Sequence, residues 1–159
     1  MPSRGTQGHI VPADGGRAVT SSLVRAQPLI AVRDVEASSR WYQTLLGVES
    51  AHGGTEYERL ELDGVLIMQL HSFDVDHDHG HIGDPHQLVG NGVLLWFEID
   101  DFDAAVRRAG TLHADVVLAP HRNPPDGEPG GPAHREIWLH DPDGYTVVLA
   151  SPDGESPLT

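Results

Sequence analysis

The segment Arg135–Ala150 constrains the fold more than any other, because two apolar-rich runs flank Asp141-Pro142-Asp143-Gly144. Proline suits the first central position of a type I turn, and Gly144 can adopt the left-handed conformation that closes a three-residue hairpin loop. This turn sets the register of two antiparallel strands, with Trp138 opposite Val148. Side chains alternate across a strand, so one face of the hairpin carries a mixed set: Glu136, Trp138, His140, Thr146, Val148 and Ala150. We expect this face, which combines a carboxylate with an indole, to carry a ligand site.

The hydrophobic periodicity predicts the same order of elements twice, a strand, a helix and three strands. The first unit has one helix, N-capped by Asp34 and ended by Gly47, among four strands: Leu23–Val32, Val48–Ala51, Glu56–Leu62 and Val65–His71. In the second unit a helix capped by Asp100 or Asp101 runs through Ala114, and the hairpin supplies the last two strands after Val93–Ile99 and Asp115–Ala119.

These units predict a single domain over residues 23–152 between two flexible tails, 1–22 and 153–159. Module 1 covers about 23–72, a polar, histidine-rich loop covers 72–91, and module 2 covers about 92–152. A second long loop, His121–Ala133, is either a lid over a pocket or a surface turn.

Composition excludes several kinds of partner and chemistry. The formal net charge of −14 argues against binding to nucleic acid or to an anionic membrane surface. The absence of cysteine excludes disulfides, thiolate metal sites and a thiol nucleophile. No run reaches transmembrane length and residues 1–22 lack the apolar centre of a signal peptide, so we expect a cytoplasmic protein.

Two motifs carry a resemblance to a known family. One leads from Val32-Arg33-Asp34-Val35 to Trp41-Tyr42 and Leu46-Gly47, and the other is Asp141-Pro142-Asp143-Gly144-Tyr145. With the doubled unit, they resemble the vicinal oxygen chelate superfamily, which includes glyoxalase I, extradiol dioxygenases and the fosfomycin- and bleomycin-resistance proteins. The resemblance covers about Leu23 to Ser151. It implies an α+β fold in which two βαβββ modules form a curved mixed sheet around a cleft.

The resemblance also implies where a metal would be held. The ligand positions of metal-dependent members align with Gln27, Gln69, Leu94 and Val148. Leucine and valine cannot bind a divalent ion, and two amide oxygens alone make a poor site for one. We therefore expect the usual metal site to be lost and no cofactor to be held there.

Alternation places Trp96 and Trp138 on the cavity side with Leu94 and Val148. The two indoles either fill a core or line a pocket. The same face carries Gln27, Gln69 and Glu136, and polar groups buried in a solid core need partners or cost a few kcal/mol each. Aromatic walls with a few polar groups are typical of a small-molecule pocket, which we favour.

Two histidines, His71 and His134, share these faces, two residues from Gln69 and Glu136 respectively. The four side chains could form a relocated metal site or a general base with its orienting carboxylate, whereas the simpler hypothesis is two solvated histidines at the rim. The Asp76–His81 loop could bind transition metals or form a pH-sensitive lid. The simplest interpretation of that loop is a solvated segment with accidental metal affinity.

The sequence predicts a small-molecule-binding protein of the glyoxalase and bleomycin-resistance type, which sequesters an aromatic or cationic natural product without metal catalysis. Its expected ligand-binding residues are Gln27, Gln69, His71, Trp96, His134, Glu136, Trp138 and Val148. We expect a homodimer, with the cleft either within one chain or shared between two. The alternative is a lyase, isomerase or dioxygenase with a divalent metal on Gln27, Gln69, His71, His134 and Glu136. A third possibility is an assembly subunit whose cleft is vestigial.

Overall fold

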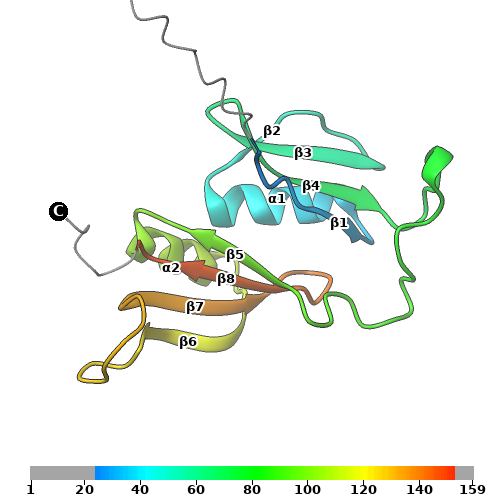
Figure 1. The fold of residues 1–159 in the computed structure, drawn as a ribbon. Helices are drawn as coiled ribbons and strands as arrows, with labels where there is room; N and C mark the ends of the chain where they lie inside the picture. The colour runs from blue at the N-terminus through cyan, green and yellow to red at the C-terminus, as the bar shows by residue number, and fades with distance from the viewer. Residues whose placement is uncertain (1–23, 153–159) are drawn as a thin grey trace, which may run out of the picture.

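A computed structural model describes residues 24–152 and confirms the doubled order of elements (Figure 1). The first unit consists of β1 Leu29–Val32, α1 Val35–Leu46, β2 Glu49–Ser50, β3 Tyr57–Leu62 and β4 Val65–Ser72. The second consists of β5 Leu94–Glu98, α2 Phe102–Thr111, β6 Asp115–Asn123, β7 His134–His140 and β8 Thr146–Ala150. Between them lies a short 3-10 helix, η1 His77–His79. The predicted tails, and Leu23 of the first predicted strand, lie outside the described residues.

Each unit forms a four-stranded mixed sheet with the same strand order, β1-β4-β3-β2 in one and β5-β8-β7-β6 in the other. The first strand of each unit pairs in parallel with the last, and the other pairs are antiparallel. This is the predicted α+β architecture of two βαβββ modules. Within the described residues no helix is long and apolar enough to cross a membrane.

Helix caps agree with the sequence. The Asp34 carboxylate accepts the Ala37 amide at 2.8 Å, and Gly47 ends α1 with a left-handed φ of 73°. The Asp101 carboxylate accepts the Ala104 amide at 2.9 Å, which decides between the two predicted caps of α2. The predicted end of α2 at Ala114 is wrong, because the helix stops at Thr111 and His113 has a positive φ of 49°.

Two predicted strand boundaries are also wrong. β1 begins at Leu29 rather than Leu23, directly after Pro28, which has no N–H to donate to a ladder. β6 continues past Ala119 to Asn123, which pairs with His134. The β6–β7 register has two irregularities, and beyond them the strand includes His121, Arg122 and Asn123, whose polar side chains suggested a loop.

A single hydrophobic core joins the two modules. It contains side chains from both helices and from one face of each sheet, including Ile30, Leu60 and Leu70 of the first sheet and Leu95, Ile137 and Leu149 of the second. The two sheets lie apart in Figure 1, and the helices pack on the sheet faces that look toward each other. The alternate residues of every strand therefore face outward, on opposite sides of the molecule.

Candidate functional site

The outward face of the second sheet carries the predicted indole pair. The hairpin register is the predicted one, and in it Val148 lies between Trp96 on β5 and Trp138 on β7. Val148 is fully buried, whereas Trp96 is 45% exposed although it lies within a sheet strand. The result is a partly exposed aromatic surface with a buried valine between its two indoles.

The Glu136 carboxylate is buried beside this surface and is held by three neighbours. Its Oε2 accepts the Trp138 indole N–H at 2.5 Å, while its Oε1 accepts the Asn123 amide and contacts His134 Nε2 at 3.2 Å. Burial acts to raise the pKa of the Glu136 carboxyl, but the hydrogen bonds from these neighbours outweigh it and lower the pKa. The side chain is thus held ionised, with both oxygens engaged by the protein.

This network changes the interpretation of the face. Sequence reasoning assumed that its polar groups would need a ligand, but the chain itself supplies the partners of Glu136. His134 is also buried and packs edge-on against Trp96, with ring centroids 5.5 Å apart. The Glu136 carboxylate therefore fixes the orientation of the Trp138 indole, and His134 connects this carboxylate to the indole of Trp96.

The remaining predicted residues lie on the outward face of the first sheet. Gln69 is half-buried on β4, where its Oε1 accepts the Tyr57 hydroxyl at 2.5 Å. Its amide donates to the backbone carbonyl of Gln27, whose exposed position precedes β1. His71 follows on the same face and is 4% exposed.

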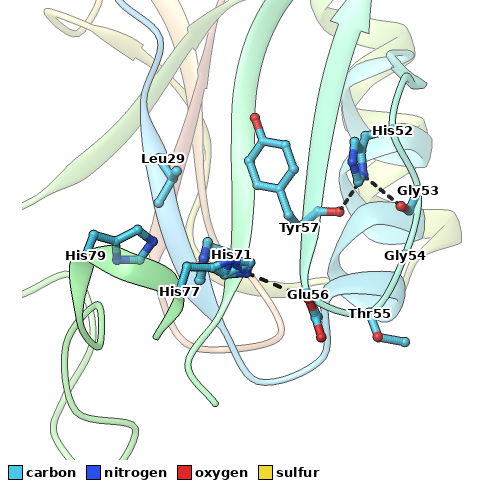
Figure 2. Close-up of a pocket in the computed structure, with 10 residues that line it drawn as sticks. All are labelled: Leu29, His52, Gly53, Gly54, Thr55, Glu56, Tyr57, His71, His77 and His79. Carbon is cyan, nitrogen blue, oxygen red and sulfur yellow. Dashed lines mark hydrogen bonds and ion pairs between the residues drawn. The ribbon is translucent and has the colours of Figure 1, made fainter. Parts of the chain in front are cut away.

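A cavity of about 640 Å³ opens on this face (Figure 2). Its floor comes from β1, β3 and β4 through Leu29, Tyr57 and His71. Its walls come from the segment 52–56 and from η1, which adds His77 and His79. Four histidines and Glu56 thus surround a space within the size range of small-molecule sites.

The predicted residues therefore form two groups in one chain. Gln27, Gln69 and His71 belong to the first sheet, whereas Trp96, His134, Glu136, Trp138 and Val148 belong to the second. Because the shared core lies between these faces, a relocated metal site that combines His71 with His134 and Glu136 does not form within one chain. Across residues 24–152, no three His, Asp or Glu side chains are arranged to hold a metal ion.

Sequence reasoning missed two kinds of residue. Asn123 was assigned to a loop, and only the β6–β7 pairing brings it to Glu136. Tyr57 could have been found by alternation, since it pairs with His71. The sequence placed His77 and His79 in a loop with possible metal affinity, but nothing in their spacing, or in that of His52, showed that they meet His71.

The position where the family implies a metal does not fit one here. Val148 offers only methyl groups between two indoles, and Leu94 is 45% exposed on β5. The Gln69 amide oxygen is already engaged by Tyr57. These aligned positions provide no donor set for a divalent ion.

Comparison with known proteins identifies the class. The model of the Glyoxalase/Bleomycin resistance protein/Dioxygenase superfamily matches residues 22–149, so the chain belongs to this family. No curated protein matches the sequence.

Solved structures share the fold at low identity. A protein of unknown function from Agrobacterium tumefaciens is 19% identical with a TM-score of 0.63, over 84% of this chain and 97% of that one. A lactoylglutathione lyase from the same organism is 16% identical with a TM-score of 0.59, over 82% and 95%. The fosfomycin resistance protein of Mesorhizobium loti is 17% identical with a TM-score of 0.53, over 80% and 91%. These likenesses support the fold and leave the ligand to be argued from the site.

Proposed function

We propose that this chain is a binding protein that sequesters a planar aromatic natural product on the indoles of Trp96 and Trp138, without metal catalysis. One observation carries the proposal: Trp96, which is 45% exposed, lies beside Val148, and Val148 occupies a strand position where the family implies a metal ligand. Stacking on an indole favours an aromatic guest, and a positive charge on that guest adds cation–π attraction of about 0.5–2 kcal/mol.

The Glu136 network supports this function by keeping the indole of Trp138 in one orientation. A fixed aromatic wall loses little side-chain entropy when a guest binds. Because both carboxylate oxygens are engaged, Glu136 contributes a buried negative charge near the guest rather than a direct contact.

We further propose that two copies of the chain pair, so that the outward face of the second sheet of one copy covers the outward face of the first sheet of the other copy. The second sheet exposes large apolar side chains on this face, among them Leu94, Trp96 and Leu118 at 45% each. Such a patch is unusual on a monomer. Pairing of this kind would close the aromatic surface over the 640 Å³ cavity of the partner.

Fluorescence titration tests the binding function directly. The chain contains three tryptophans, and replacing Trp41 by Phe leaves emission from Trp96 and Trp138 only. Proflavine serves as a planar aromatic cation and tetramethylammonium as a cation without a ring. We expect proflavine to bind and quench this emission, tetramethylammonium to bind far more weakly, and Trp96→Ala to lower the proflavine affinity about tenfold. Unchanged proflavine affinity in Trp96→Ala would overturn the proposal.

A further inference from the structure

The cavity on the first sheet contains a group of imidazoles to which the proposed function assigns no role. His71 at the end of β4 lies with its ring centroid 5.2 Å from that of His77 and 5.2 Å from that of His79. The rings of His77 and His79 are stacked at 5.8 Å. Figure 2 shows His71, His77 and His79 together at one side of the cavity, with Glu56 beside His77.

We propose that His71, His77 and His79 form a binding site for a zinc-like divalent transition metal, separate from the family's metal position. With Zn–N bonds of about 2 Å and tetrahedral angles, ring centres of ligating imidazoles lie about 5 Å apart. The separations of His71 from His77 and from His79 match that spacing, whereas the rings of His77 and His79 are nearly parallel at 4° and must turn to direct their nitrogens at one ion. Neutral imidazole is a preferred ligand for zinc, nickel and copper.

The hydrogen bonds of two rings orient their metal-binding nitrogens. Nδ1 of His71 lies 2.7 Å from the Ser72 carbonyl and Nδ1 of His79 lies 2.6 Å from the Gly80 carbonyl. A carbonyl only accepts, so Nδ1 is the donor in both rings, and in a neutral imidazole this leaves the lone pair on Nε2. Donation of the second ring N–H to a backbone carbonyl is the usual outer-shell arrangement of a ligating histidine.

The third imidazole and a carboxylate complete the set. His77 Nε2 lies 3.7 Å from Glu56 Oε2, so the metal would take a fourth ligand from Glu56 or from water. Because these donors do not yet converge among the described residues, binding requires rotation of the exposed side chain of His77 toward the nitrogens of His71 and His79. His71 is fixed in β4 and serves as the anchor.

Metal binding here is independent of the indoles that bind the proposed guest, because the imidazoles belong to the first sheet and its loop, whereas the indoles belong to the second. The competing explanation is that the histidine-rich loop binds metals nonspecifically. A variant of His71 distinguishes the two explanations, since His71 lies in β4 and not in the histidine-rich loop. His81 and His86 provide a matched control, because they are exposed in the same loop outside the cluster.

The experiment is a calorimetric titration of the full, untagged chain with Zn²⁺. We expect one ion per chain, affinity reduced more than about tenfold in His71→Asn and in His79→Ala, and wild-type affinity in the double variant His81→Ala/His86→Ala. Co²⁺ substitution should give the strong visible absorption of a tetrahedral ion, lost in His79→Ala. Circular dichroism checks that His71→Asn folds, and the exposed His79 decides the result if that variant does not. Wild-type affinity in His79→Ala or in folded His71→Asn, or an equal loss in the control, would refute the site.

Discussion

The Tyr42 hydroxyl on α1 donates to Asp141 Oδ2 at 2.8 Å, which joins the helix of the first repeat to the hairpin turn of the second. Oδ1 of the same carboxylate accepts the amides of the turn residues Asp143, Gly144 and Tyr145. Burial raises the pKa of the Tyr42 phenol, and the Asp141 carboxylate adds to that rise. The two family motifs are therefore in direct contact, and Tyr42 donates this hydrogen bond throughout the physiological pH range.

Replacing Tyr42 by Phe should destabilise the chain by about 1–3 kcal/mol, because it removes a donor from a buried carboxylate. Urea denaturation measures the change. Tyr57→Phe is the matched control, since its hydroxyl donates to the half-buried Gln69 on the outward face. Equal losses in the two variants would contradict the connecting role of Tyr42.

Glu136→Ala should destabilise the chain by about 2–4 kcal/mol, because the donors of Trp138 and Asn123 are left without their acceptor. Glu98→Ala provides the comparison: Glu98 is exposed on the same face and, like Glu136, pairs with Ala150. We expect a change within about 0.5 kcal/mol for Glu98→Ala in urea denaturation. Similar values for both variants would argue that the network is unimportant for stability.

The buried Glu58 carboxylate should make stability depend on acidic pH. Burial acts to raise the pKa of this carboxyl, but hydrogen bonds outweigh it and lower the pKa from 4.5 to about 2; their donors are the Gly53, His52 and Arg59 amides and the Ser50 hydroxyl. A lowered folded-state pKa stabilises the fold above pH 4.5, and this contribution of about 3 kcal/mol is lost as pH falls toward 2.

Comparing the wild type with Glu58→Gln isolates this carboxylate from the others. The difference in unfolding free energy should be largest above pH 4.5 and should shrink as pH approaches 2. Guanidinium denaturation across this range measures it. A difference that stays constant with pH would exclude ionisation of Glu58 as the cause.

Leu118→Arg should convert a dimer into a monomer, because Leu118 lies on the exposed apolar face in register with Trp138. Analytical ultracentrifugation measures the association state. Leu88→Arg is the control, since Leu88 is 92% exposed in the loop between the modules and should tolerate the charge. A wild-type chain that sediments as a monomer at high micromolar concentration would contradict the pairing.

The sequence predicted the fold because local signals agreed with each other. The Asp141–Gly144 turn fixed the hairpin register, and the caps at Asp34 and Asp101 marked both helices. β6 was underestimated because its last residues, including Pro120 and Asn123, are typical of loops. The strand continues past an irregularity that contains Pro120, because His121, Arg122 and Asn123 pair with β7. Local propensity does not contain that information.

The site was less predictable, because its contacts join residues that are distant in sequence or have no periodicity. Alternation correctly placed Trp138 and Val148 on one face. It could not show that the Glu136 carboxylate would be satisfied by Asn123, or that η1 would bring His77 and His79 to His71. It also did not show that the two repeats turn their candidate faces away from each other, which depends on how the helices pack in the shared core.

This back-to-back packing has a consequence for any measured dissociation constant. If each complete pocket needs surfaces from two molecules, dilution dissociates the two chains and removes the pocket, even though every chain stays folded. Apparent ligand affinity would then weaken as the protein is diluted below its self-association constant, and a saturating guest would in turn hold the pair together.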